Sequence, residues 1–265
     1  MIKRCVICEL RRAFDSVGTK ISILIGSVIV FLDLFTFYLQ YGSPGDKILI
    51  QAWIGTDFQF AYNSLFYIVF PIIACLPFAG SYYQDVFSGY DKNICVRISR
   101  KQYMFAKCFA VYVSAFVCSI IPLLGNLFIV AGLYPNSLPE KLDFLSAGII
   151  DCHRFPVLFS KSPLSYCLVF IIIDGFFAGA LGLVSVAVAK YCKSQFSAVI
   201  TPFVIYILTG VIMVNESGYS ISIMEMVNPI QRYIATTEQM CVVYLFIVII
   251  SILVIWFCGR KRDIL

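Results

Sequence analysis

The sequence predicts an all-α, polytopic membrane protein that forms one transmembrane domain over residues 1–265. Of these residues, 60% are hydrophobic and only 13% are charged, about half the charged fraction of an ordinary soluble domain. The mean hydropathy is +0.90. The apolar residues are also clustered in runs long enough to cross a bilayer as helices. Together these observations favour a bundle of membrane-spanning helices.

The N-terminal segment, residues 1–20, precedes the first apolar run and is predicted to contain an amphipathic helix over residues 2–17. Apolar residues such as Val6, Leu10 and Phe14 share one face of that helix, and basic residues such as Arg11 share the other. Glu9 fits the apolar face poorly. A basic amphipathic helix ahead of a span is expected to lie along the inner membrane surface. The alternative is a basic segment that only sets the topology.

Six apolar runs are predicted to cross the membrane. At about 1.5 Å per residue, each run can cover most or all of a hydrocarbon core about 30 Å thick. Pro71 and Pro77 are expected to bend the second span. The predicted spans are residues 21–39, 60–79, 103–133, 164–189, 196–214 and 240–258.

The fourth predicted span contains a series of small residues, Gly175, Ala178, Gly179 and Gly182. Small residues spaced four apart allow two helices to approach closely in lipid. We therefore expect this span to pack tightly against a neighbour.

The polar interval 82–107 separates the second and third spans and has a structure of its own. Gly89 is predicted to stop a short helix that includes Asp85, and Ser99 with Gln102 has the spacing of a capping box that opens the next helix. A loop with helices of its own suggests docking to a partner. Its charged residues are mostly basic: Lys92, Arg97, Arg100, Lys101 and Lys107, against Asp85 and Asp91.

Two segments between spans are predicted to carry short helices without crossing the membrane. Ser137 and Glu140 have a capping-box spacing, which predicts a surface helix within residues 134–163. Residues 221–227 are moderately apolar but too short to span, so they are expected to form a re-entrant or interfacial helix before the last span.

The distribution of basic residues sets the expected orientation. Lys and Arg collect in loops that stay in the cytoplasm. With six spans, only five of the 20 basic residues fall in outer segments, namely Lys47, Lys141, Arg154, Lys161 and Arg232. Both termini are therefore expected in the cytoplasm, and we expect the plasma membrane of a bacterium.

Most chemistry that would identify an enzyme is absent from the sequence. No phosphate-binding G-x-x-x-x-G-K-[ST] loop and no G-x-S-x-G motif occurs, and His153 is the single histidine. No metal site is predicted, and Cys5 and Cys8 form a lone CxxC that we interpret as small helix residues. The net charge of +5 does not indicate nucleic-acid binding, because in a membrane protein the distribution of the basic residues, which sets the orientation, matters more than their sum.

Asp33 and Asp174 are the only acidic residues well inside predicted spans. An ionisable group in the membrane is costly and is a candidate for function. Both residues are therefore candidates for a translocation path. The alternative is that each is protonated or hydrogen-bonded to a neighbour and serves packing alone.

The chain resembles the membrane (permease) subunits of type-2 ATP-binding-cassette (ABC) exporters. The resemblance covers essentially the whole chain and rests on the start ICELRRAF, the loop DVFSGYDKNICVRISRKQYMFAK, the inner turn KYCKSQFSAVI and the outer NPIQRY. The loop is the most specific part. The chain departs from family members with large extracellular domains, so no substrate-capturing ectodomain is expected.

The resemblance implies that the loop is a coupling helix that docks on a separate ABC ATPase subunit, present in two copies. The implied coupling residues are Asp85, Gly89, Asp91, Arg97, Arg100 and Lys101. No cofactor is expected in this chain itself, since ATP and Mg²⁺ would be bound by the ATPase. A second permease subunit, identical or a sister chain, is also implied, with membrane lipid around the pair.

The expected function is ATP-driven export of an amphipathic or apolar substrate, such as a peptide antibiotic, a bacteriocin or a lipid-like molecule. Two alternatives remain open. One is a peptide-sensing or immunity protein that transports nothing, and the other is an intramembrane enzyme that uses Asp33 and Asp174.

Overall fold

A computed structural model describes residues 2–41, 47–56, 61–138, 154–189, 191–192, 194–212, 221–230 and 235–260. Within these residues all regular secondary structure is helical. The helices are α1 (Ile2–Asp15), α2 (Val17–Tyr41), α3 (Leu49–Ala52), α4 (Ala61–Cys75), α5 (Ser81–Phe87), α6 (Tyr90–Cys95), α7 (Arg100–Leu133), α9 (Pro156–Lys161), α10 (Pro163–Val188), α11 (Gln195–Ile212), α12 (Ile223–Val227) and α13 (Thr237–Arg260).

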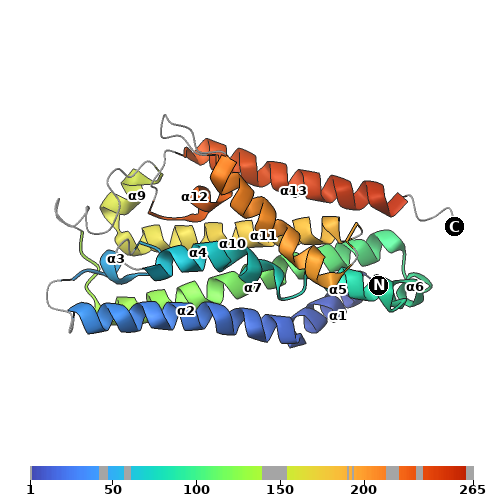
Figure 1. Ribbon diagram of the computed structural model, residues 1–265, viewed down its shortest axis with the longest axis horizontal. Helices are drawn as coiled ribbons and strands as arrows, with labels where there is room; N and C mark the ends of the chain where they lie inside the picture. The colour runs from blue at the N-terminus through green and yellow to red at the C-terminus, as the bar shows by residue number, and fades with distance from the viewer. Residues whose placement is uncertain are drawn as a thin grey trace.

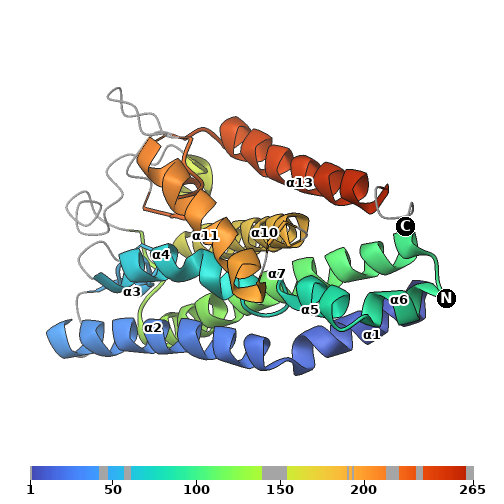
Figure 2. The ribbon, with the colours of Figure 1, turned by 45° about the vertical axis from the view of Figure 1, so that its right-hand side comes forward.

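The long helices form an elongated bundle whose two ends differ (Figure 1). One end carries α1, α5, α6, the beginning of α7 and the end of α13, so α1 begins and α13 ends at the same end of the bundle. The other end carries α3 and α9. Helix α10 packs against α4, α7, α11 and α13 and forms the centre of the bundle. Figure 2 shows α13 along one side, leaning away from α2.

Among the described residues, four helices are long and apolar enough to cross a membrane: α2, α7, α10 and α13. This confirms an α-helical protein of membrane-spanning character. Their ends differ from the predicted spans by at most four residues. Helices α4 and α11 are apolar but shorter, so six crossings remain a prediction.

The two shorter helices nevertheless run between the same two ends of the bundle. Arg12, just before α2, forms an ion pair with Asp85 of α5, with 2.7 Å between guanidinium and carboxylate. The chain leaves this end along α2 and must return along α4 to place Asp85 there. Gln84 of α5 donates a 2.7 Å hydrogen bond to Gln195 at the start of α11, so α11 begins at this end as well.

The second predicted span is wrong at its inner end. The helix was expected to reach residue 79, but α4 ends at Cys75 and Pro77 lies in the turn that follows. Pro71 alone lies within the helix. A proline lacks the N–H that continues the helix, so Pro77 ends the helix where a bend was expected.

Hydroxyl groups from other helices bind the carbonyls that these prolines leave without a helical donor. In an α-helix the N–H of residue i donates to the carbonyl of residue i−4. Proline has no N–H, so the carbonyls four residues before Pro71, Pro77 and Pro202 lack a helical donor. These are the carbonyls of Tyr67, Ile73 and Ala198. The hydroxyls that donate instead are Tyr206 to Tyr67 at 2.9 Å, Ser22 to Ile73 at 2.6 Å and Ser185 to Ala198 at 2.6 Å. These bonds tie α4 to α2 and α11, and α10 to α11.

The small residues of α10 lie against α7, as their spacing indicates. A Cβ added at Gly179 would come within 2.6 Å of the Tyr112 ring, and one added at Gly175 within 2.6 Å of Ile120. Contacts this close are not compatible with a larger side chain unless the helices move apart. The glycines therefore set the spacing between α7 and α10.

The prediction of a surface helix after Ser137 falls mainly on residues 139–153, outside the described residues. In the other predicted segment, residues 221–227, a short helix does form as α12. Its Ile223, Met226 and Val227 side chains are buried, so α12 packs into the bundle.

Candidate functional site

The loop between α4 and α7 contains two short helices joined at Gly89. Helix α5 ends at Phe87, and Gly89 adopts a left-handed conformation with φ of 73° before α6 begins. This backbone conformation costs glycine little. Ser99 caps α7 by accepting a hydrogen bond from the Gln102 N–H at 3.4 Å. The glycine stop and the Ser99 cap are thus both confirmed.

A cluster of four charges, three of them buried and Arg12 about one third exposed, fixes this loop to the rest of the molecule. The Lys107 ammonium lies 2.7 Å from Glu9 and 2.5 Å from Asp85. Arg12 binds the same two carboxylates, at 2.8 Å and 2.7 Å. The Tyr103 hydroxyl donates a 2.6 Å hydrogen bond to Asp85. Two carboxylates and two cations therefore link α1, α5 and α7.

Aromatic rings surround the charges of this cluster. The Tyr90 ring of α6 lies 4.3 Å from the Arg12 guanidinium, and the Phe78 ring lies 4.4 Å from the Lys107 ammonium. Both distances fit cation–π contacts. Glu9, Asp85 and Lys107 are all at least 98% buried. The contact with Tyr90 includes α6 in the same unit.

The charges also determine the protonation of the cluster. Burial by itself would raise the pKa of Asp85, but the hydrogen bond from Arg12, the Lys107 charge and Tyr103 lower the pKa below its ordinary value of 3.8. For Arg12, burial acts to lower the pKa, while the bond and charge of Asp85 and the charge of Glu9 raise it above its ordinary value. Both groups are therefore ionised at neutral pH.

The helix over residues 2–17 was expected to lie along the inner membrane surface. On its predicted apolar face Phe14 and Val17 are exposed on the protein and Ala13 is buried, and Glu9, an imperfect position of the pattern, is buried as well. Glu9 is buried because it pairs with Lys107 and Arg12. The exposed apolar side chains remain on the surface of the chain, where a membrane surface would cover them.

The predicted coupling residues occupy two different environments. Asp85 is buried in the cluster and holds the loop in place, so it cannot reach a partner directly. Arg97 and Lys101 are exposed, while Asp91 and Arg100 are partly buried. The loop also exposes Phe87 by 83% and Val96 by 87%, two side chains that sequence reasoning had not singled out.

The two predicted translocation-path residues are each buried and lie in different surroundings. Asp33 lies on the face of α2 that also carries Gly26, whose added Cβ would meet Pro122 of α7. Asp174 of α10 accepts a 3.2 Å hydrogen bond from the Tyr67 hydroxyl of α4. Both side chains are fully buried within the chain. The surroundings of Asp174 match the alternative of a hydrogen-bonded packing residue.

Another buried charged side chain, Arg154, lies near α12. From the sequence it is predicted only as one of the basic residues of the outer segments. Arg154 is fully buried and donates hydrogen bonds to the carbonyls of Glu225, Met226 and Asn228. These carbonyls lie at the C-terminal end of α12, where a cation is favoured. The next residue, Phe155, has a φ of 56°, uncommon for a bulky residue. Arg154 therefore anchors α12 in the bundle.

No group of three or more His, Cys, Asp or Glu side chains that could hold a metal ion occurs in the part of the chain that the structure describes. The cysteines of that part are free thiols, including Cys5 and Cys8.

Comparison with known proteins adds no family to this description: no family model, no curated protein and no solved structure matches the chain. Its function is therefore inferred from the residues and their arrangement.

Proposed function

We propose that the chain is the permease subunit of a type-2 ABC exporter, with six membrane crossings and both termini in the cytoplasm. A separate ATPase, present in two copies, binds the α5–α6 loop, and a second permease subunit completes the pathway. The cargo is an amphipathic or apolar molecule. The observation that carries the proposal is the attachment of a structured, exposed loop to two long helical segments through a largely buried charge cluster.

The cluster provides a route for mechanical coupling. A partner that moves the loop would move Asp85, which is paired with Arg12 of α1 and Lys107 of α7. Breaking a buried ion pair while leaving one partner unpaired costs about 3–5 kcal/mol. A displacement of the loop is therefore transmitted to α1 and α7 with little loss. ATP-driven closure of two ATPase subunits could in this way shift the spans between two packings.

The exposed surface of the loop fits a protein partner. Phe87 and Val96 offer apolar contact area, and Arg97 offers a cation for a carboxylate. Both apolar side chains are more than four-fifths exposed, so a partner can reach them.

Co-purification tests this function. The chain is expressed from its own genetic locus with an affinity tag, and the ATPase activity that co-purifies is measured. Arg97→Glu with Arg100→Glu, or Gly89→Val, should abolish the co-purifying activity and leave the chain in the membrane. Valine at position 89 would have to adopt a positive φ.

Gly125→Val is the matched control, because a Cβ at Gly125 also meets nothing within 4 Å and Gly125 has no positive φ. This variant should retain the ATPase. A complex that survives the Arg97→Glu/Arg100→Glu and Gly89→Val changes, with normal ATP-driven export, would contradict the proposal. Resistance to a peptide that persists with a hydrolysis-deficient ATPase would instead favour the sensing or immunity role.

The proposed path through Asp33 and Asp174 is tested separately. Asp→Asn at either position keeps a hydrogen-bond acceptor for neighbours such as Tyr67, so membrane insertion should be retained. Transport or stimulated ATP hydrolysis should fall if the carboxylate charge is used. Unchanged transport in both variants would assign the two residues to packing. Peptide cleavage by the purified chain without any ATPase would favour the intramembrane enzyme.

A further inference from the structure

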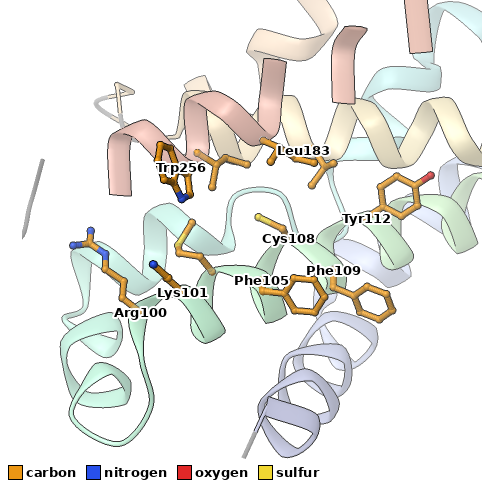
Figure 3. A pocket seen from close by; sticks show the side chains of 11 residues that line it. Arg100, Lys101, Phe105, Cys108, Phe109, Tyr112, Leu183 and Trp256 are labelled. Atoms are coloured by element: carbon orange, nitrogen blue, oxygen red, sulfur yellow. The ribbon is translucent and has the colours of Figure 1, made fainter. Parts of the chain in front are cut away.

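A pocket of about 720 Å³ lies between α7, α10 and α13, apart from the charge cluster. Its walls are mostly apolar: Phe105, Cys108 and Phe109 of α7 with Leu183 of α10 and Ile252 of α13. Figure 3 shows Arg100 and Lys101 at one end of the pocket and Tyr112 at the other. The pocket therefore has a cationic end and an apolar body.

The length of the pocket corresponds to one leaflet of a bilayer. From Arg100 to Tyr112, α7 advances about 18 Å at 1.5 Å per residue. Half of a hydrocarbon core of about 30 Å is about 15 Å. The cationic end lies at the end of the bundle that carries α1, α5 and α6, where headgroups of that leaflet would be. Trp256 lines the pocket near this end, and tryptophan is enriched at the membrane interface.

The pocket is closed at depth and open toward the surrounding membrane. At the deep end the Tyr112 and Tyr244 hydroxyls form a 2.8 Å hydrogen bond that joins α7 to α13. Along the sides, Phe105 is 57% exposed, Ile252 51% and Trp256 51%. An occupant would therefore enter sideways from the bilayer and would extend no deeper than the tyrosine pair.

We propose that this pocket binds an anionic phospholipid of the same leaflet. Its phosphate lies at Arg100 and Lys101, and an acyl chain lies along Phe105, Cys108 and Phe109. The cations select the anionic headgroup, and the apolar walls take the chain. Because α13 packs mainly on α10, the bound lipid fills the space between α13 and α7. The inference requires no ATPase, but Arg100 and Lys101 are also among the implied coupling residues, so its test uses the purified chain alone.

Fluorescence of Trp256 tests the site. The purified chain is placed in bilayer discs of phosphatidylcholine that contain increasing fractions of brominated phosphatidylglycerol or brominated phosphatidylcholine, since bromine quenches nearby tryptophan. The second tryptophan, Trp53, is fully buried, and its signal is subtracted with Trp256→Phe. Brominated phosphatidylglycerol should quench Trp256 at about a 30-fold lower mole fraction, the preference expected for two cations near the headgroup.

Two variants with matched controls assign the preference to the pocket. Arg100→Gln with Lys101→Gln should remove it, whereas Lys92→Gln, an exposed basic residue of the same loop, should not. Cys108→Phe fills the pocket and should reduce quenching by phosphatidylglycerol, whereas Cys241→Phe on an exposed position of α13 should not.

Equal quenching by both lipids, or a preference that persists in Arg100→Gln/Lys101→Gln or in Cys108→Phe, would overturn the proposal. So would protection of Trp256 from both lipids when the chain is reconstituted at high density, because a second copy would then be covering the pocket.

Discussion

The charges of Glu9, Arg12, Asp85 and Lys107 cancel within one largely buried cluster. Each carboxylate contacts both cations, so no single member can be removed without leaving a charge of one sign in excess. Buried ion pairs add little when replaced as a whole by apolar groups, but loss of one member is strongly destabilising. The cluster therefore acts mainly to specify how α1, α5 and α7 fit together.

Lys107→Met is predicted to lower the free energy of unfolding by about 3–5 kcal/mol, because Glu9 and Asp85 lose a shared cation. Adding Glu9→Gln should recover part of this loss, since Arg12 and Asp85 then form a neutral pair. Thermal unfolding in detergent can be followed by reaction of the buried thiols Cys75, Cys118 and Cys167. Purely additive losses in the double variant would contradict the cluster.

Arg11→Met is the control for the Lys107 series. Arg11 pairs with Asp15 on the surface of α1, where both side chains are mostly exposed. Exposed pairs contribute little to stability, so this variant should unfold like the unchanged chain.

The lowered pKa of Asp85 predicts an acid dependence of stability. A carboxyl group whose pKa is lower in the folded state stabilises the fold above its ordinary pKa of 3.8, and this contribution is lost as the pH falls below it. The difference in melting temperature between the unchanged chain and Asp85→Asn should thus be constant from neutral pH to about pH 5 and shrink below 3.8. Circular dichroism measures it. A difference that is independent of pH down to the acid limit would contradict the assignment.

Some residues of the cluster could be identified from the sequence and others could not. Asp85 and Lys107 belong to the loop that was singled out, and Glu9 was visible as a misfit on an apolar face. The pattern alone did not show that Glu9 is buried and pairs with Lys107 and Arg12. The choice of Arg12 and Tyr103 as its neighbours depends on the packing of α1 against α7, which no local pattern encodes. Arg154 was missed for the same reason.

Helices α4 and α11 contain prolines whose structural consequence lies in other helices. The sequence shows which span contains a proline and which carbonyl, four residues earlier, loses its helical donor. The sequence does not show which hydroxyl donates to that carbonyl instead, because Ser22, Ser185 and Tyr206 are remote in sequence from the carbonyls they bind. The prediction that Pro77 bends a span was wrong because the turn after Cys75 and the Ser22 contact replace the helix there.

Ser185→Ala is predicted to destabilise the chain by about 1 kcal/mol, because the Ala198 carbonyl loses its donor inside the bundle. In a Pro202→Ala background, residue 202 supplies an N–H to that carbonyl and the same change should have almost no effect. A loss that is equal in both backgrounds would show that the hydroxyl does not compensate for the proline.

Ser119→Ala is the matched control for Ser185→Ala. The Ser119 hydroxyl donates to the Phe116 carbonyl within its own helix, and that carbonyl keeps its helical donor at residue 120. The variant should therefore be nearly neutral.

The chain as a whole consists of helical segments that run between one end rich in basic residues and an opposite end. The ranges of α2, α7, α10 and α13 were predictable to within a few residues because long apolar runs have few alternatives to a helix. That α4 and α11 also cross the membrane remains a prediction, because both helices are short. The Arg12–Asp85 and Gln84–Gln195 contacts place the end of α4 and the start of α11 at the same end of the bundle.

The arrangement predicts which positions a membrane-impermeant reagent can reach. In a cysteine-depleted background, a cysteine at Leu138 should be labelled from outside the cell, and one at Lys92 only after the membrane is opened. Both positions are exposed on the protein. Labelling of Lys92→Cys in intact cells would reverse the orientation and place the α5–α6 loop beyond the reach of any cytoplasmic ATPase.

The proposed partner of the α5–α6 loop can be tested directly with a photo-crosslinking amino acid at Val96, which is 87% exposed. The same amino acid at Val242, an exposed position on α13, controls for contacts with the surrounding membrane. Irradiation should join position 96, and not position 242, to an ATPase that carries a phosphate-binding loop, and Arg97→Glu should remove the product. Crosslinks from position 96 to lipid alone, or to a protein without an ATP-binding site, would contradict the coupling role of the loop.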